Sequence, residues 1–284
     1  MRILITGKNS YIGNSVKAWL NEKEPLFIVE EISLRNLDLN EVSFNKYDVV
    51  FHVAGIAHIS SSKKMIPEYF RVNRDLAIEV AKKAKQEGVK QLIFTSSMAI
   101  YGDDRPIGDF TSIDINHPKP TNAYGQSKLE ADIEIQKLHD GVFNVSILRI
   151  PMVYGVNSKG NFPKLEKIAK KLPVFPKIEN KRSVINVLSL AELIRQIIIK
   201  NHSGVFYPQD NHHFSTSKFI KDFRTKIHKK TSFIPFLSVL LRILSFIVKP
   251  INKIYGNKFY ELKHSIYNGL DYQIENVSSY MNKL

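Results

Sequence analysis

Tyr124 and Lys128 have the residue types and the spacing needed for acid–base chemistry. Residues four apart share one face of a helix. A tyrosine with an ordinary pKa of about 10 exchanges protons poorly at neutral pH, but a neighbouring ammonium stabilises the phenolate and lowers that pKa. Ser97 can then orient a carbonyl while Tyr124 gives a proton to its oxygen and a hydride reaches its carbon. These three residues therefore predict carbonyl–alcohol chemistry with a hydride carrier.

A glycine-containing turn near the N-terminus predicts the binding site of that carrier, a nicotinamide dinucleotide. Residues 6–13 read Thr-Gly-Lys-Asn-Ser-Tyr-Ile-Gly and join an apolar run to a helical pattern. Gly7 permits a tight turn, Gly13 permits close helix packing, and a helix N-terminus attracts a pyrophosphate. Ser10 stands where a glycine is usual, and its hydroxyl could donate to phosphate. A purely structural turn is the alternative. The residues predicted to contact the cofactor here are Gly7, Asn9, Ser10, Tyr11, Ile12 and Gly13.

The loop after the second predicted strand indicates which dinucleotide binds. An acidic residue there favours a free ribose 2′-hydroxyl, whereas an arginine pairs with a 2′-phosphate. Arg35 therefore favours NADP(H), with NAD(H) as the alternative if Arg35 is only an exposed loop residue. Small residues at Ala54 and Gly55 leave room for ribose and phosphates. The other predicted cofactor contacts are Asp38, Leu39, Ala57, Pro151, Tyr124 and Lys128.

Apolar runs that alternate with amphipathic helical patterns predict the elements that position these residues. Strands are expected near 2–6, 26–29, 49–54, 91–97 and 144–150, and helices near 11–20, 71–85, 123–138, 162–171, 189–201 and 215–227. This order is typical of an α/β fold with a doubly wound parallel sheet of the Rossmann type, whose ligands bind at the carboxyl ends of the strands. We predict a dinucleotide-binding domain at 1–155, its sheet completed by segments near 184–207. Residues 156–284 should form a smaller, mainly helical substrate lobe.

Composition limits the classes of function. The chain has 284 residues, no cysteine and a formal net charge of +14. No thiolate chemistry is available, no metal is implied, and the absence of an apolar leader favours the cytoplasm. The charge would suit nucleic acid, an anionic membrane or phosphate-rich ligands, or be spread over solvated helix faces. No nucleic-acid-binding motif is recognised, so we expect no nucleic-acid partner.

Together these motifs carry a resemblance to a known family. Thr6-Gly7 to Gly13, Ser96-Ser97 with Tyr101-Gly102, Tyr124-Gly125-Gln126-Ser127-Lys128, and Leu148-Arg149 with Val153-Tyr154-Gly155 resemble the extended short-chain dehydrogenase/reductases over about residues 1–200. The resemblance implies the roles given above for Ser97, Tyr124 and Lys128. Its commonest members act on nucleotide sugars as epimerases, 4,6-dehydratases or 4-ketoreductases.

The residues beside Ser97 discriminate among these reactions. The dehydratases of the family have an Asp-Glu pair after this position, but this chain has Met98-Ala99 and so lacks the acid and base of dehydration. The epimerases hold NAD tightly and commonly have asparagine where Met152 stands, so Arg35 and Met152 favour a reductase. A non-catalytic dinucleotide sensor is a third hypothesis, which the intact triad disfavours.

The segment from Leu148 to Ser183 is similar to bacterial reductases of UDP-4-keto-6-deoxy-N-acetylhexosamines, which serve capsule and O-antigen synthesis. The resemblance implies that Asn161 and Arg182 meet the UDP diphosphate and that residues 172–176, with Phe175, line the uracil. Arg182 could instead form a structural ion pair. His58 could touch the sugar or cap a loop. The predicted substrate-binding residues are His58, Ser97, Met98, Asn161, Phe175 and Arg182.

The C-terminal third contains an apolar, basic stretch. Residues 233–248 are largely apolar, and residues 217–263 contain eleven lysines and arginines against Asp222 and Glu261. We expect a core helix of the substrate lobe. The alternative is contact between the 233–256 segment and an anionic membrane surface, which would place the protein peripherally at the inner face of the membrane. A homodimer through the helices at 71–85 and 123–138 is a further expectation.

Overall fold

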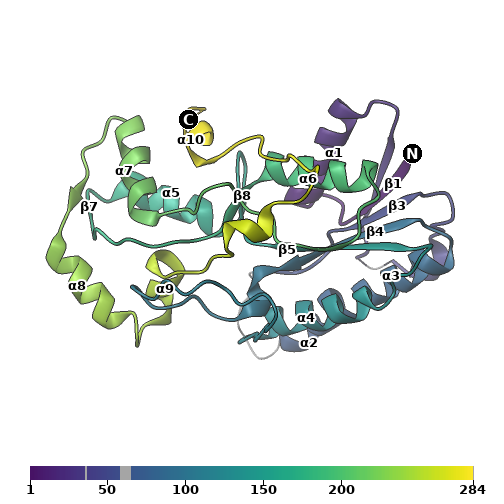
Figure 1. Ribbon diagram of the computed structural model, residues 1–284, viewed down its shortest axis with the longest axis horizontal. Helices are drawn as coiled ribbons and strands as arrows, with labels where there is room; N and C mark the ends of the chain where they lie inside the picture. Colours follow the sequence, from purple (N-terminus) through teal and green to yellow (C-terminus); the bar gives the residue numbers. More distant parts are fainter. Residues whose placement is uncertain (36, 58–64, 284) are drawn as a thin grey trace.

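The computed structural model describes residues 1–35, 37–57 and 65–283, which form two lobes (Figure 1). The first lobe contains a parallel sheet in the order β2-β1-β3-β4-β5-β9. Its strands are β1 (Arg2–Thr6), β2 (Ile28–Ile32), β3 (Val49–His52), β4 (Gln91–Ser97), β5 (Asn144–Ile150) and β9 (Gly204–Phe206). The predicted Rossmann-type α/β fold is confirmed.

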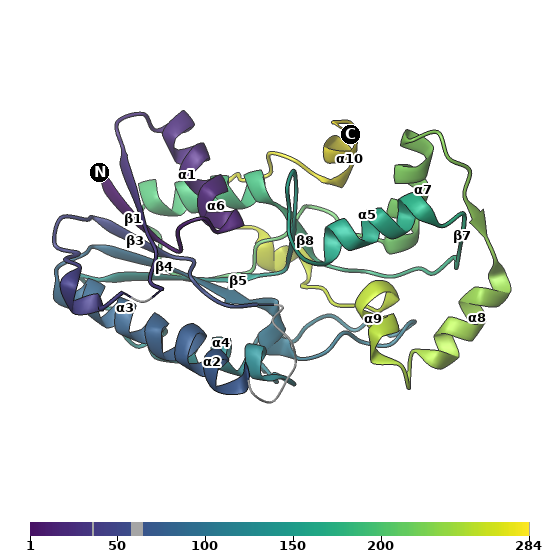
Figure 2. The ribbon, with the colours of Figure 1, turned by 180° about the vertical axis from the view of Figure 1, so that it is seen from behind.

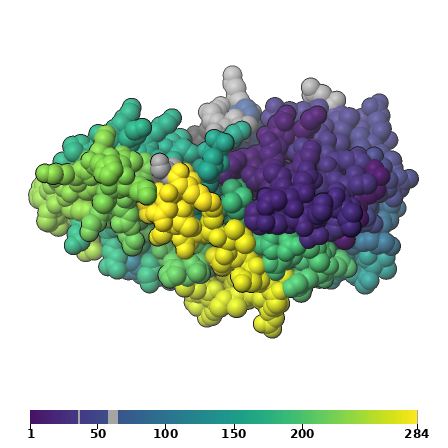
Figure 3. Space-filling model, turned by 90° about the horizontal axis from the view of Figure 1, so that it is seen from above, coloured from purple at the N-terminus to yellow at the C-terminus, as the bar shows by residue number. Residues whose placement is uncertain are grey.

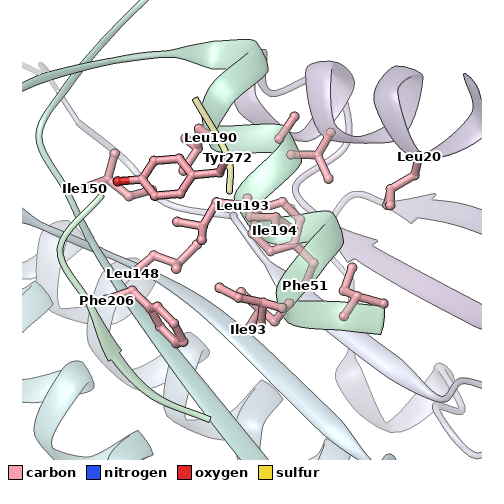
Figure 4. Close-up of a cluster of buried hydrophobic side chains, with 14 of the residues drawn as sticks. Leu20, Phe51, Ile93, Leu148, Ile150, Leu190, Leu193, Ile194, Phe206 and Tyr272 are labelled. Carbon is pink, nitrogen blue, oxygen red and sulfur yellow. The ribbon is translucent and has the colours of Figure 1, made fainter. Parts of the chain in front are cut away.

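Helices cover both faces of the sheet (Figures 1 and 2). On one face, α1 (Tyr11–Lys23) and α6 (Val187–Ile199) bury apolar side chains against alternate strand residues, including those drawn in Figure 4. On the other face, α3 (Leu76–Gln86) and α4 (Ala123–Gln136) pack on the intervening residues. Strands that are buried on both faces explain the wholly apolar runs in the sequence.

Two predicted elements differ from the structure. The strand expected at 26–29 lies at Ile28–Ile32, because Arg2 pairs with Glu30 and Lys17 with Glu31, and these cations allow carboxylates in the strand. The helix expected at 71–85 consists of a π-helical turn (Arg71–Asp75) and α3, and it is preceded by a short helix, α2 (Ile66–Phe70), that was not predicted. Such π turns often occur at functional sites.

The second lobe is built mainly of helices around an aromatic core. Its elements are β6 (Met152–Tyr154), α5 (Asn161–Lys171), β7 (Val174–Phe175), β8 (Val184–Asn186), α7 (Thr216–Lys226), β10 (Ser232–Phe233), α8 (Pro235–Leu244), α9 (Lys249–Tyr255) and α10 (Val277–Met281). Tyr154, Phe162 and Phe219 are fully buried at its centre. Three short 3-10 helices complete the described part: η1 (Leu39–Glu41), η4 (Met98–Tyr101) and η5 (Leu262–Ser265).

The chain passes between the two lobes more than once. α6 and β9 come from the C-terminal half yet pack in the first lobe, and Figure 3 shows the C-terminal segment, in yellow, lying between the two lobes on that face. There Ser189 on α6 donates to the backbone oxygen of Glu275 at 3.1 Å. The boundary at residue 155 stays a prediction.

The expectation of a core helix within 233–248 is wrong. No residue of α8 is buried. The aromatic core of the lobe is filled by side chains of α5, α7 and α10, and α8 contributes only Leu241 to a small cluster with Ile107, Ile178 and Tyr255. Within the described residues, no helix is both long and apolar enough to cross a membrane.

Candidate active site

The turn after β1 lies so close to neighbouring residues that it has no room for a Cβ atom at two positions. Gly7 has a φ of +126°, and a Cβ there would lie 2.9 Å from the backbone nitrogen of Ala54. A Cβ on Gly13 would lie 2.5 Å from the Ser10 Oγ. Asn9 also has a positive φ, of 65°. Glycine is therefore required at both ends of this turn.

The start of α1 fits an anionic group. Ser10 caps the helix, since its Oγ accepts a hydrogen bond from the Gly13 amide at 3.1 Å, which leaves its hydroxyl proton free to donate. Across the described ranges, the amides of Tyr11 and Ile12 have no acceptor. The Tyr11 hydroxyl is buried near Gly155 with no partner among the residues that the structure describes, and burial raises its pKa to about 12. Free amides at a helix N-terminus are the donors that a pyrophosphate needs.

Two residues at the end of β2 compete to set the ribose preference. Arg35 lies exposed just beyond this strand. Glu31, which we had not predicted as a contact, pairs through Oε2 with Lys17 at 2.8 Å, while its Oε1 is buried without a partner in the part of the chain described. An unpartnered carboxylate oxygen can accept from ribose hydroxyls. The signal in the sequence is an acid eighteen residues after Gly13.

Substitutions of Arg35 and of Glu31 should change the preference between NADPH and NADH in opposite directions. We expect Arg35→Ala to weaken NADPH binding roughly tenfold and leave NADH binding unchanged, because only NADPH carries the 2′-phosphate. Glu31→Gln should weaken NADH binding more than NADPH binding. Titration of each variant with both dinucleotides by fluorescence checks this. Equal losses for both dinucleotides in Arg35→Ala would contradict a phosphate contact.

The remaining predicted cofactor contacts lie around this turn. Asp38 caps η1 by accepting from the Asn40 amide. Leu39 packs against the apolar cluster on the side of the sheet that α3 and α4 cover. Gly55 and Ala57 are exposed after β3, and Pro151 is buried between β5 and β6.

Ser97 and Tyr124 meet at the carboxyl end of β4. The Ser97 Oγ accepts from the Ala99 amide at 3.1 Å and starts η4, while Asn122 caps α4 and so fixes the first turn that carries Tyr124. Burial raises the pKa of Tyr124, and its hydrogen bond with Ser97 opposes this only in part. The pKa of Tyr124 is thus raised rather than lowered, and stabilisation of its phenolate by Lys128 stays a prediction. Tyr124 is therefore a phenol at neutral pH, the form of a proton donor.

Lys128 follows Tyr124 by about one turn of α4. Its Nζ donates to the backbone oxygen of Thr95 at 2.8 Å, and a Cβ on Gly55 would lie 3.3 Å from it. Burial lowers the pKa of Lys128 to about 8, against the charge of Asp132, which raises it. Burial and the charge of Lys128 together lower the pKa of His52 to about 3, so His52 is neutral. The ammonium is thus held at the strand ends beside Gly55.

Two buried polar groups hold these elements, and sequence reasoning missed both. Asp132 accepts from the Ser96 Oγ at 2.6 Å and from Nε and Nη2 of Arg149 at 3.0 Å each, which ties α4 to β4 and β5. Asn73, in the π-helical turn, accepts from the Ile56 amide at 2.9 Å and donates to the Ile56 oxygen and the Ser127 Oγ. These contacts fix the loop after β3 against α4.

The predicted substrate residues are spread between the lobes. Met98 is buried in η4, and Asn161 is exposed at the first turn of α5, after Gly160 with a φ of +94°. Phe175 has a buried ring stacked under the Arg224 guanidinium in the core of the second lobe, so its side chain is not free to line a uracil. His58 lies outside the described residues.

Arg182 is engaged with protein groups. Its Nη2 lies 2.7 Å from Oδ1 of Asp104, and both side chains are largely buried. Its Nη1 donates to the backbone oxygens of Asn252 and Gly256 at 3.1 and 3.2 Å. These contacts match the structural alternative for Arg182, and a contact with a diphosphate stays a prediction.

Known proteins resemble this chain in sequence and in fold. UDP-glucose 4-epimerase of Vibrio cholerae is 29% identical over 256 residues, which cover 82% of this chain and 78% of that protein. The human UDP-glucose 4-epimerase is 28% identical over 56% of this chain and 55% of its own length.

Two solved structures share the fold. UDP-glucuronic acid 4-epimerase of Bacillus cereus, with NAD, superposes with a TM-score of 0.73 at 19% identity and covers 99% of this chain and 96% of its own. dTDP-4-dehydrorhamnose reductase of Bacillus anthracis, in complex with NADP, gives 0.72 at 20% identity over 99% and 97%. Proteins with this fold thus bind either NAD or NADP.

Residues 3–211 match the model of the NAD dependent epimerase/dehydratase family. That match spans both the dinucleotide turn and the Ser97–Tyr124–Lys128 site. The chain therefore belongs to the NAD dependent epimerase/dehydratase family.

Proposed function

We propose that this protein reduces the C4 ketone of a UDP-4-keto-6-deoxy-N-acetylhexosamine with NADPH, in bacterial surface polysaccharide synthesis. The observation that carries the proposal is the pair of hydroxyls of Ser97 and Tyr124 at the end of β4, with the Lys128 ammonium held at the Thr95 oxygen of the same strand. Two converging donors suit a carbonyl oxygen that gains negative charge.

Each residue of the site has a separate task in this reaction. NADPH supplies the hydride when bound. Ser97 orients the ketone oxygen, and Tyr124 donates its proton to that oxygen as the charge develops. The ammonium of Lys128 stabilises the phenolate left behind. The raised pKa of Tyr124 keeps the proton available before the reaction.

The neighbours of Ser97 support reduction over dehydration. Met98 is buried and Ala99 carries no polar group, so neither can protonate a leaving hydroxyl or remove a sugar proton. On the substrate side, the exposed first turn of α5, with Asn161, offers a helix N-terminus for the UDP diphosphate, as the resemblance implies.

A nucleotide-sugar 4-epimerase is the second candidate. The Vibrio cholerae relative, matched over most of this chain, is named UDP-glucose 4-epimerase, and the unpartnered Glu31 oxygen favours NAD. The dinucleotide that copurifies with the protein discriminates between the two. Tightly retained NAD would support epimerisation, and a protein that purifies free of dinucleotide and takes up NADPH would support reduction.

The reductase should lose activity on the alkaline side of pH 8. Lys128 is protonated below its pKa of about 8 and neutral above it, whereas burial keeps Tyr124 protonated across this range. We therefore expect kcat/KM for ketone reduction to fall as pH rises through about 8. A pH profile of the wild type, compared with Lys128→Arg, checks this, since arginine stays charged. A decline at the same pH in an active Lys128→Arg variant would exclude Lys128 as its source.

The product identifies the reaction directly. The purified protein is incubated with NADPH and a UDP-4-keto-6-deoxy-N-acetylhexosamine, and NMR reads the new C4–H. We expect one C4 configuration only, because the sugar presents one face to the nicotinamide. An unchanged ketone would count against the proposal.

A further inference from the structure

An apolar stripe on the second lobe faces solvent. It consists of Phe236, Val239, Leu240, Ile243, Phe246 and Ile247. Spacings of three and four place these residues on one side of α8 and of the turn that follows. Phe236 is 75% exposed and Ile247 is 79% exposed. An amphipathic helix normally turns such a side toward the core, so the outward direction of the stripe requires an explanation.

The opposite side of α8 is anchored, and this fixes the stripe outward. Ser238 accepts from the Lys177 amide at 2.8 Å, and the buried Ser245 accepts from the Ile107 amide at 3.4 Å. The Asn252 side chain donates to the Ser245 oxygen at 2.7 Å. These polar contacts hold the inner side of the helix on the lobe.

A basic cavity lies at the start of α8. It has a volume of about 730 Å³ and leads to Phe233 and Pro235 of this segment. Its cationic or titratable lining residues are Lys177, Lys221, His228, Lys229 and Lys230, and no acidic residue of the described part of the chain lines it. Over residues 1–35, 37–57 and 65–283, none of these side chains forms an ion pair. The cavity is therefore suited to a phosphate-bearing group beside an apolar surface.

The stripe lies far from the candidate active site. α8 occupies the end of the second lobe that points away from the sheet, whereas the site lies at the strand ends between the lobes (Figures 1 and 2). A surface bound along α8 would leave the site between the lobes accessible.

We propose that the stripe and the basic cavity dock this protein on an anionic lipid bilayer. The stripe would enter the boundary between headgroups and acyl chains, and the cavity would receive a lipid phosphate. Charge favours a bilayer over a second copy of the chain, since a symmetric contact through this end would bring two basic cavities together. α8 has ten residues, which suits a helix that lies in the interface.

Vesicle co-sedimentation of the full chain tests the apolar part of the proposal. The wild type should sediment with vesicles of phosphatidylcholine and phosphatidylglycerol and stay in solution with phosphatidylcholine alone. Phe236→Glu with Ile243→Glu should lower the partition coefficient roughly tenfold or more, because two apolar side chains that would enter the bilayer are lost. Val142→Glu with Ile266→Glu, at equally exposed positions elsewhere, is the matched control and should bind as the wild type does.

A second pair of variants, with the same net charge as each other, tests the cavity. Lys221→Glu with Lys230→Glu should also weaken sedimentation roughly tenfold or more, whereas Lys82→Glu with Lys90→Glu, on the first lobe, should have little effect. Thermal unfolding verifies that each variant is folded.

Three results would overturn the proposal: no sedimentation with anionic vesicles, equal losses in variants and controls, or a stripe that covers a dimer. In the last case, light scattering would show a dimer that Phe236→Glu with Ile243→Glu converts to a monomer, without vesicle binding. None of these readouts depends on the reductase reaction.

Discussion

Tyr124→Phe is expected to lower kcat for ketone reduction by roughly two to four orders of magnitude while KM stays nearly constant. The substitution removes the proton that Tyr124 would give to the ketone oxygen and leaves the ring that packs edge-on against Tyr69 at 6.1 Å. Steady-state kinetics with saturating NADPH measure the effect, and titration with NADPH verifies that the dinucleotide site is intact.

Tyr47→Phe is the matched control for Tyr124→Phe. It also removes a phenol, which donates to Glu30 at 2.5 Å next to β2, away from Ser97 and Lys128. Its kcat should stay close to that of the wild type. Full activity in Tyr124→Phe would mean that another group supplies the proton and that the assigned role is wrong.

Asp132→Ala is expected to have the largest effect on stability, about 3–5 kcal/mol. The carboxylate is fully buried and binds both Ser96 and Arg149, whose side chain is 9% exposed, so its loss leaves a buried cation without its carboxylate partner. Urea unfolding followed by circular dichroism measures the change.

Glu134→Ala, two residues along α4, removes an exposed pair with Lys137 and should change stability by less than about 1 kcal/mol. An equally small effect of Asp132→Ala would show that the buried ion pair does not hold α4 to β4 and β5. A lower kcat for ketone reduction in Asp132→Ala protein that is still folded and binds NADPH normally would identify Asp132 as a positioning residue for Tyr124 and Lys128.

Local signals in the sequence were sufficient for the first lobe. Gly7 and Gly13 are needed for steric reasons that any β-turn-α unit shares, and the strands at 91–97 and 144–150 are buried along almost their whole length because both faces are covered. The place of Ser97 and Tyr124 follows from these elements, since the end of a parallel strand and the first turn of the next helix meet at one edge of the sheet.

Contacts between distant residues could not be inferred in this way. Arg182 and Asp104 are 78 residues apart, and nothing local indicates that they pair. The same holds for Asp132 and Arg149, which lie on different elements. For α8, the apolar period predicts a helix with one apolar side, but not whether that side faces the core or solvent, because this depends on how fully the other helices fill the lobe.

The absorbance of NADPH at 340 nm tests the proposed reaction most directly. With a UDP-4-keto-6-deoxy-N-acetylhexosamine as substrate, we expect one NADPH to be oxidised for each ketone lost, and oxidation roughly 100-fold or more slower with Tyr124→Phe. Unchanged absorbance with the wild type, together with interconversion of UDP-sugar C4 epimers by bound NAD, would contradict a ketone reductase and support an epimerase.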